Sequence, residues 1–302
     1  MVERLKDAIT KARARRDGSV GAPLGLHANA GLAGTAAAPP SPAAQVDELW
    51  ANLAELPIDA DRMRRERIVA FQKTDPSHVT FDVLRTRLLK VMRENGWTRL
   101  AITSPTKGCG KTVITMNLAF SLSRHPNFKT MLIDMDLKAP RIASVLGATG
   151  KRQISWFLSG QTAPETYMNR IGENLAVALN NTRVRDSAEL IENPTTEASI
   201  AHAQRRMRPE ITLFDLPPML VNDDALAFTS VADCVMLVIS AGESRAADID
   251  ECERLLSANT NFLGILLNKH RDPRRDPYAY GYGYGYGGYG YGGGGGYGNE
   301  KG

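Results

Sequence analysis

The apolar residues in the second half of the chain gather in short runs separated by polar residues, glycine and proline. Runs of this kind, rich in β-branched and other hydrophobic residues, are typical of buried strands. The predicted strands are Arg99–Thr103, Lys129–Asp134, Leu175–Leu179, Ile211–Asp215, Cys234–Ser240 and Phe262–Asn268.

Apolar residues at helical spacing predict helices between these strands. They cover Val113–Arg124, Thr195–Met207, Asp223–Val231 and Ser244–Ala258. Two earlier helices are predicted over Gln45–Leu56, closed by Pro57, and over Val79–Arg93, stopped by Gly96. Alternating strands and helices predict an α/β fold with a doubly wound, mainly parallel sheet, in which ligands bind beyond the carboxyl ends of the strands.

Composition divides the chain into five segments. Residues 75–270 carry the strand and helix pattern and are expected to form the globular domain, preceded by a short helical and basic segment over 46–74. Residues 18–45 are rich in Ala, Gly and Pro and are expected to act as a linker. Residues 1–17 form a basic arm with one small apolar helical face, expected to dock weakly on a membrane or a partner. Residues 271–302 are mostly Gly and Tyr, a composition that cannot bury a core.

The segment Ser104-Pro-Thr-Lys-Gly-Cys-Gly-Lys-Thr112 lies between a predicted strand and a predicted helix. A glycine loop in this setting points its N–H groups and the helix N-terminus at a phosphate. Lys111 is expected to reach the terminal phosphates, and the Thr112 hydroxyl to bind Mg²⁺. The expected ligands are therefore nucleotide phosphates and Mg²⁺, bound by Lys107, Gly108, Cys109, Gly110, Lys111, Thr112, Val113 and, from the last strand, Asn268.

Two predicted strands end in carboxylates. Asp134 and Asp136 follow one apolar run, and Asp215 follows another, just before Pro217 and Pro218 stop the strand. Parallel strands bring their carboxyl ends to one edge, so the three aspartates are expected near Lys111. Phosphoryl transfer needs carboxylates to hold the metal and one to orient or deprotonate the nucleophile.

Net charge, cysteine content and hydropathy indicate which partners and which cellular compartment to expect. A net charge of +4 gives no general attraction to nucleic acid. Three widely spaced cysteines without metal-ligand spacing indicate a reducing compartment. No run of 18 apolar residues and no signal-peptide pattern is found, so we expect a cytoplasmic chain that reaches a membrane through its basic arm or a partner.

Together, the phosphate loop, the Ile-Asp134-Met-Asp136-Leu-Lys138 segment and the Phe-Asp215-Leu-Pro-Pro218 segment resemble the Walker A, A′ and B motifs of bacterial tyrosine kinases of the capsule and exopolysaccharide type. The resemblance implies a P-loop NTPase architecture and ATP-dependent phosphorylation of tyrosine, with Lys111 on the phosphates, Thr112 and Asp215 at the metal, and Asp134 or Asp136 either coordinating magnesium or activating the hydroxyl. Which aspartate is the base stays open.

The chain also departs from that family pattern. Lys138 stands where the family usually carries arginine, and Lys107 where it usually carries proline. The family motif thought to build a ring is present only in part, over Phe81–Arg87.

Tyrosine is concentrated at the C-terminus, which holds eight of the nine tyrosines. They are either phosphoacceptors that glycine lets enter a narrow site, which we favour, or the rings of a self-associating segment. The ten residues after Asn268 span at most about 35 Å, which keeps the first tyrosines near a nucleotide site. The predicted phosphoacceptors are Tyr278, Tyr280, Tyr282, Tyr284, Tyr286, Tyr289, Tyr291 and Tyr297.

The resemblance implies a membrane-embedded activator of the chain-length-control type, a homo-oligomer that could be a ring, and a role in polysaccharide export. Two other functions stay open. A nucleotide switch like the partition and division-site positioning ATPases usually has a second lysine five residues before the loop lysine, whereas Lys107 lies four before Lys111. A non-catalytic ATP-binding scaffold would keep Lys111 and Thr112 essential but make Asp134 and Asp136 replaceable.

Overall fold

The computed structural model describes residues 41–270, which form one packed unit built on an eight-stranded sheet. The strand order is β1-β4-β5-β3-β6-β2-β7-β8, and all neighbours are parallel except β4 and β5. The strands are β1 Ala54–Glu55, β2 Arg99–Thr103, β3 Thr130–Asp134, β4 Asn169–Ile171, β5 Leu175–Ala178, β6 Ile211–Asp215, β7 Cys234–Ser240 and β8 Asn261–Asn268. The expected α/β, mainly parallel sheet is confirmed.

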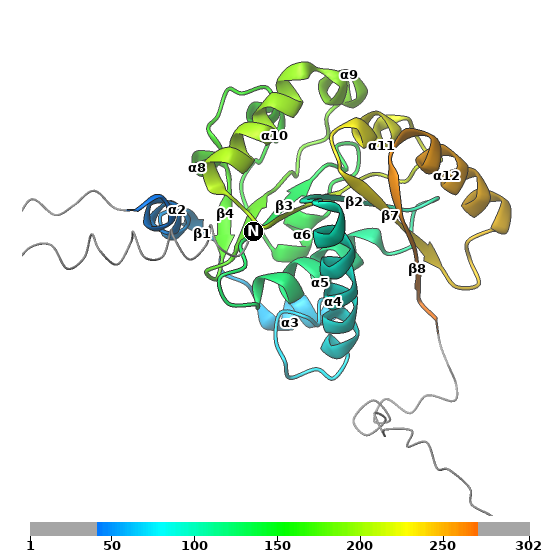
Figure 1. The fold of residues 1–302 in the computed structure, drawn as a ribbon, viewed down its shortest axis with the longest axis horizontal. Coiled ribbons are helices and arrows are strands. Elements are labelled where there is room, and N and C mark those ends of the chain that lie inside the picture. Colours follow the sequence, from blue (N-terminus) through cyan, green and yellow to red (C-terminus); the bar gives the residue numbers. More distant parts are fainter. Residues whose placement is uncertain (1–40, 271–302) are drawn as a thin grey trace, which may run out of the picture. The chain divides into compact units, whose positions relative to one another are not determined.

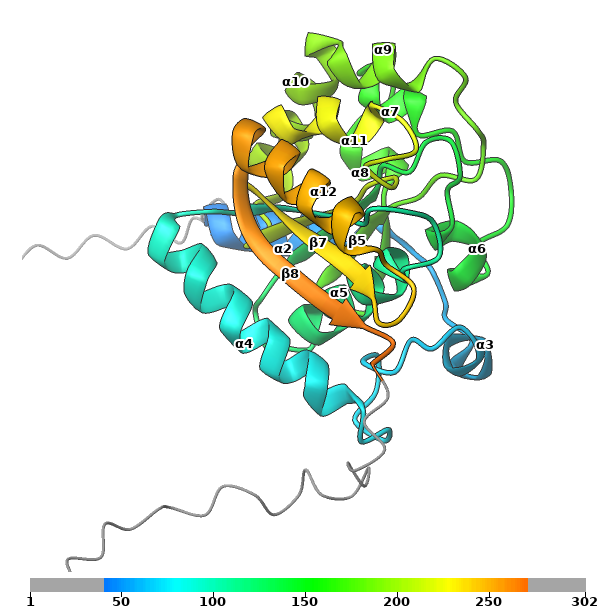
Figure 2. The ribbon, with the colours of Figure 1, turned by 90° about the vertical axis from the view of Figure 1, so that its right-hand side faces the viewer.

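Helices cover both faces of this sheet (Figure 1). The helices are α2 Pro42–Ala51, α3 Ala60–Arg65, α4 His78–Asn95, α5 Lys111–Ser123, α6 Ile142–Leu146, α7 Ser155–Leu158, α8 Pro164–Tyr167, α9 Ser187–Glu192, α10 Pro194–Met207, α11 Asp224–Ala227 with the 3₁₀ turn Phe228–Ser230, and α12 Ala246–Asn259. In Figure 2, α12 lies on one side of β7 and β8 while α4 and α5 lie on the other.

Each face of the sheet has its own hydrophobic core. One core joins the sheet to α2, α7, α10, α11 and α12, and the other joins it to α3, α4, α5 and α6. The central strands β3 and β6 are buried along their whole length, which explains why they appear in the sequence as continuous apolar runs.

Most predicted elements lie within one or two residues of the observed ones, and β2, β6 and β7 have the predicted bounds. Local signals account for several boundaries. Gly96 ends α4 in the left-handed conformation at φ 69°. Asn193 caps α10, with Pro194 in its first turn. The predicted helix over Asp223–Val231 is shorter, because its second half is a 3₁₀ turn.

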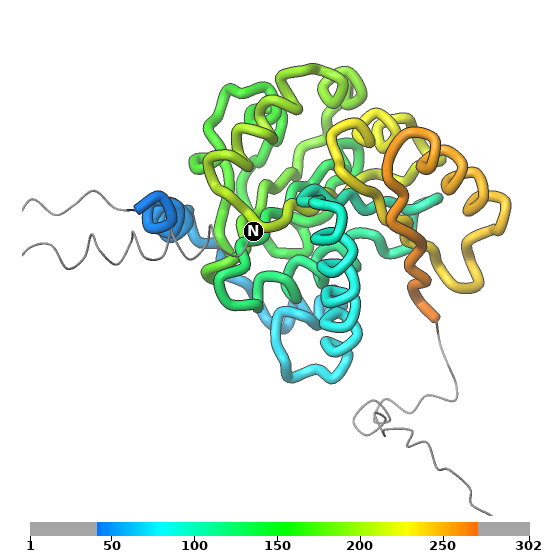
Figure 3. Tube along the Cα trace, viewed as in Figure 1, coloured from blue at the N-terminus to red at the C-terminus, as the bar shows by residue number. Residues whose placement is uncertain are grey.

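The differences lie in two regions: between residues 142 and 192, where β4 and the short helices α6 to α9 were not predicted, and before residue 75. The helix predicted over Gln45–Leu56 begins at Pro42, capped by Ser41, and ends at Ala51. Residues Ala54 and Glu55 instead form the edge strand β1, which pairs with β4 and was not predicted. Its partner lies more than a hundred residues away, so no local pattern identifies it; Figure 3 traces this early segment, in blue, beside the green part of the chain.

Residues expected to precede the globular domain belong to its core. Trp50 is 1% exposed and its indole Nε1 donates to the Met207 carbonyl at 2.7 Å. Met63 and Ile68 are buried in the opposite core. The unit therefore begins near residue 41. The basic arm, most of the linker and the eight C-terminal tyrosines lie outside the described residues.

Candidate active site

The phosphate loop connects β2 to α5, and its two glycines adopt backbone conformations that other residues avoid. Gly108 has φ +86° and Gly110 has φ +91°. A Cβ atom added at Gly110 would lie 2.3 Å from Nδ2 of Asn268, the last residue of β8. Asn268 donates from this amide to the Cys109 carbonyl at 2.8 Å. The last residue of β8 therefore fixes the backbone of the phosphate loop.

Lys111 begins α5 and lies among carboxylates. Its Nζ is 2.8 Å from Asp136 Oδ2 and 3.7 Å from Asp215 Oδ2. Burial alone would lower the pKa of Lys111, but the negative charges of Asp215 and Asp136 outweigh burial and raise it. Lys111 is therefore positively charged at the N-terminus of α5.

Thr112 and Asp215 form the second contact pair. The Thr112 hydroxyl donates to Asp215 Oδ2 at 2.6 Å, and Thr115 lies 3.4 Å from the other oxygen. Burial raises the pKa of Asp215, while Lys111 and the Thr112 hydrogen bond lower it in part. Asp215 is completely buried below the loop.

Asp134 and Asp136 have different surroundings despite their spacing. Asp134 is fully buried and accepts from the Ile142 backbone N–H at 3.1 Å. Burial, followed by the nearby charge of Asp215, raises its pKa well above the ordinary value. Asp136 lines the pocket and accepts from the Ala139 N–H at 3.1 Å. Of the two carboxylates, Asp136 is the one that reaches the pocket.

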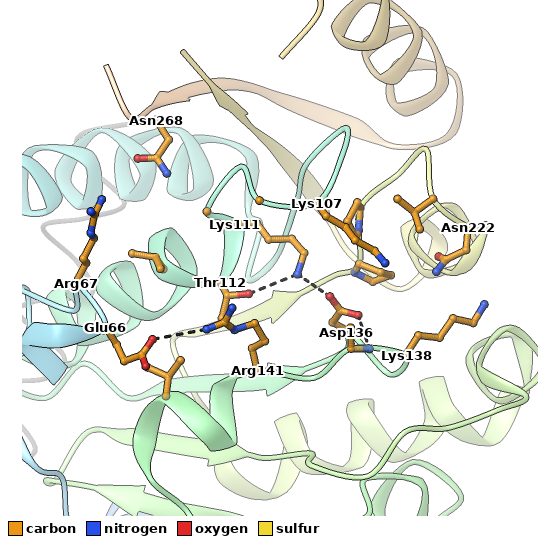
Figure 4. A pocket seen from close by; sticks show the side chains of 18 of the residues that line it. Glu66, Arg67, Lys107, Lys111, Thr112, Asp136, Lys138, Arg141, Asn222 and Asn268 are labelled. Carbon is orange, nitrogen blue, oxygen red and sulfur yellow. Dashed lines mark hydrogen bonds and ion pairs between the residues drawn. The ribbon is translucent and has the colours of Figure 1, made fainter. Parts of the chain in front are cut away.

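Lys111, Thr112 and Asp136 line a pocket of about 720 Å³, a size typical of small-molecule sites (Figure 4). The pocket contains most of the predicted nucleotide-binding residues, namely Lys107, Gly108, Gly110, Lys111, Thr112, Val113 and Asn268. Cys109 is different: its side chain is buried, with Sγ 3.7 Å from the Ser244 hydroxyl, and only its carbonyl contacts Asn268.

Sequence patterns did not identify several basic residues of the pocket. Arg67, Arg141, Arg183 and Lys269 line it, and Glu66 pairs with Arg141 at 3.6 Å. Arg67 has φ 61°, rare for a residue with a side chain. The loop around it is fixed by Asn117 of α5, whose side chain bonds the backbone of residues 67, 69 and 70. Asn117 lies five residues, about one and a half helical turns, after Thr112, and this position is the only local signal that could have indicated it.

The residues present fit a magnesium nucleotide. Mg²⁺ in such sites is held by one or two carboxylates, a hydroxyl, water and phosphate oxygens. Thr112 and Asp215, in direct contact, provide the hydroxyl and a carboxylate. Gly110, where a side chain would overlap Asn268, keeps the loop backbone close to the end of β8. Among residues 41–270, no group of three or more His, Cys, Asp or Glu side chains is arranged to hold a metal by itself.

Asp82 and Arg85, which belong to the partial ring motif around Phe81, make contacts within the chain. Asp82 of α4 binds the Arg124 guanidinium, accepts from the Ser121 hydroxyl at 2.6 Å and pairs with Arg85 at 3.0 Å. The carboxylate and one of the arginines of this motif therefore join α4 to α5.

Fold and site together define a P-loop nucleotide-binding protein. A family model described as the CobQ/CobB/MinD/ParA nucleotide binding domain matches residues 100–279. The chain belongs to this family and, within it, to the bacterial tyrosine kinases, as its relatives show.

Two curated relatives and one solved structure represent that group. Tyrosine-protein kinase CpsD of Streptococcus pneumoniae serotype 4 is 30% identical over 177 residues, which cover 56% of this chain and 75% of the relative. Tyrosine-protein kinase CpsD of Streptococcus agalactiae is 29% identical over 201 residues, 63% of this chain and 82% of the relative. The crystal structure of the VpsO kinase domain superposes with a TM-score of 0.56 at 26% identity, covering 64% of this chain and 96% of that one.

Proposed function

We propose that the chain is an ATP- and Mg²⁺-dependent tyrosine kinase that phosphorylates its own C-terminal tyrosines, Tyr278 to Tyr297. The observation that carries this proposal is the convergence of Lys111, Thr112, Asp136 and Asp215 at the edge of the sheet where β8 also ends. Asn268, the last residue of β8, lines the same pocket, and the tyrosine segment begins ten residues later. The names of the relatives support the same chemistry.

Each residue has a distinct role in this proposal. Lys111 binds the transferred phosphoryl group, and Thr112 with Asp215 holds the magnesium ion, which neutralises charge on the phosphates. Asp136 faces the pocket and accepts the proton of the tyrosine hydroxyl as its oxygen bonds to phosphorus and the bond to the leaving diphosphate breaks. Asp134, buried behind it, supports the metal side from the end of β3. Lys107, Gly108, Gly110, Val113 and Asn268 contact the nucleotide.

The test is the intact mass of the full chain after incubation with ATP and Mg²⁺. We expect successive increments of one phosphate, confined by peptide mapping to residues 278–297. Lys111→Ala should abolish them, while Lys90→Ala, on the exposed side of α4, should not. ATP hydrolysis without any mass change would indicate a nucleotide switch instead. Binding of ATP with neither hydrolysis nor phosphate incorporation would favour a non-catalytic ATP-binding scaffold.

A second comparison separates the two aspartates. Asp136→Asn removes the base that reaches the pocket and should lower the rate of phosphate incorporation by roughly 10²- to 10⁴-fold, the range of general base catalysis. Asp134→Asn should act mainly through the metal, so that raising the Mg²⁺ concentration recovers part of the rate. The same Mg²⁺ dependence in both variants would remove the assignment of Asp136 as the base.

We also propose that the kinase works as a homo-oligomer with a membrane-embedded activator and acts in polysaccharide export. The family resemblance supports this setting, and the basic arm over residues 1–17 is the proposed contact. None of the helices in residues 41–270 is long and apolar enough to cross a membrane. Deleting residues 1–17 should reduce recovery of the protein in the membrane fraction; unchanged recovery would contradict the role of the arm.

A further inference from the structure

A further buried carboxylate lies outside the phosphate loop and contacts a residue that lines the pocket. Asp224, the first residue of α11, is completely buried. One oxygen is 3.1 Å from Lys138 Nζ, and the other accepts from the Ser187 hydroxyl at 2.7 Å. A buried carboxylate is costly unless it is paired and hydrogen bonded. Asp224 meets this requirement with partners from two other segments.

These partners come from the loops that follow three different strands. Lys138 follows β3, Ser187 begins α9 after β5, and Asp224 follows β6. The same loops bond to one another, since Val184 N–H donates to the Leu137 carbonyl at 3.0 Å. All three loops contribute residues to the lining of the pocket, among them Lys138, Arg183 and Asn222. Asp224 therefore connects the loops that follow β3, β5 and β6 on one side of the pocket.

Lys138 is connected to Asp136 through a short turn. The Ala139 N–H donates both to the Asp136 carbonyl at 3.2 Å and to its Oδ1 at 3.1 Å. Asp136 Oδ2 is the partner of Lys111. In Figure 4, Lys138 extends toward the side of Asn222, while Asp136 faces Lys111. Fixing the end of Lys138 thus fixes the turn that aims the Asp136 carboxylate.

We propose that Asp224 is a positioning residue of the phosphoryl-transfer site. By binding Lys138 and Ser187 it holds the turn 136–139 so that Asp136 faces the acceptor hydroxyl. The inference rests on the proposed tyrosine kinase function. It assigns no contact between Asp224 and substrate.

The experiment compares variants of the full chain in the phosphate-incorporation assay. Asp224→Asn keeps the shape and can still accept from Ser187, but it removes the ion pair. We expect the maximal rate to fall roughly 10- to 100-fold, as for other residues that orient a reacting group. The dissociation constant for ATP, measured by titration, should change at most a few-fold, because the phosphate loop is untouched.

Three further variants test the coupling. Lys138→Met should have a similar effect, and the double variant should be no slower than the slower single variant, because both changes break the same pair. Lys138→Arg keeps a cation at this position and should retain most of the rate. Ser187→Ala leaves the ion pair in place but removes a hydrogen bond to Asp224, so it should lower the rate less than Asp224→Asn does.

Two outcomes would overturn the inference. One is a wild-type rate in Asp224→Asn, measured well below its melting temperature. The other is a double variant in which the two losses multiply, because Lys138 and Asp224 would then act independently. If Asp224→Asn does not fold, the Lys138 variants decide, since that side chain is 41% exposed and tolerates change. Failure of the proposed function gives a different result: the wild-type chain itself would then incorporate no phosphate.

Discussion

Asp134 and Asp215 lie directly opposite each other at the carboxyl ends of the adjacent parallel strands β3 and β6. Both are fully buried, and the negative charge of Asp215 adds to burial in raising the pKa of Asp134. Lys111 is the cation that offsets this repulsion. Because burial disfavours both charged carboxylates, this pair lowers the stability of the nucleotide-free protein at neutral pH.

Asp134→Asn should therefore stabilise the nucleotide-free protein at neutral pH while lowering its activity. The pKa of Asp134 is raised in the folded state, so its contribution to stability decreases as pH rises from its ordinary pKa near 3.8 through the folded value. The melting temperature of the variant should exceed that of wild type at pH 7, by about 2–4 °C for each kcal/mol relieved. The difference should shrink as the pH falls toward 4.

The contrasting variant is Asp136→Asn, which breaks the 2.8 Å pair with Lys111 and should lower the melting temperature. A lower melting temperature for Asp134→Asn at pH 7 would contradict the prediction.

Gly110→Ala should abolish nucleotide binding and destabilise the loop. The new methyl group would overlap Asn268 at 2.3 Å, in a backbone conformation with φ +91°. Gly108→Ala is the matched control, because its φ of +86° is similarly unfavourable but no atom lies within 4 Å of the added carbon. The difference in ATP affinity between the two variants measures the clash. Equal losses would show that backbone strain alone is responsible.

Trp50→Ala should cost about 3–5 kcal/mol in the free energy of unfolding, as expected for a large buried ring. Trp50 is 1% exposed and its indole bonds the Met207 carbonyl. Trp156→Ala is the control, since that ring is 47% exposed. Urea denaturation of the full chain measures both. Similar midpoints for the two variants would mean that α2 is not part of the cooperative unit.

Asp82→Ala should lower the free energy of unfolding by roughly 1–3 kcal/mol, because it leaves Arg85, Arg124 and Ser121 without their shared partner. The exposed pair between Asp61 and Arg64 provides the control, and Asp61→Ala should change stability by less than about 0.5 kcal/mol. The same denaturation experiment reports both values. If Asp82→Ala has no effect on the monomer but alters sedimentation, the motif acts between subunits instead.

The parts of the fold that the sequence predicts best are those with a strong local pattern. Strands β2, β6 and β7 are continuous apolar runs with polar or proline ends, and their bounds coincide with prediction. Lys111, Asp136 and Asp215 could be placed together because parallel strands share an edge. Strands β1 and β4 have only two and three residues, and pairing between distant segments defines them. For the same reason, the sequence did not indicate that Arg67, Arg141 and Arg183 line the pocket.

The contact between Lys111 Nζ and Asp136 Oδ2 means that the protein provides its own anion for the phosphate-binding lysine. A nucleotide phosphate has to take the place of a carboxylate that belongs to the same site. Once replaced, Asp136 is released from its ion pair with Lys111 and faces the pocket without that partner. In the proposed kinase, ATP binding and the release of Asp136 from Lys111 are therefore one exchange of partners, which favours an order of binding in which ATP enters before the tyrosine.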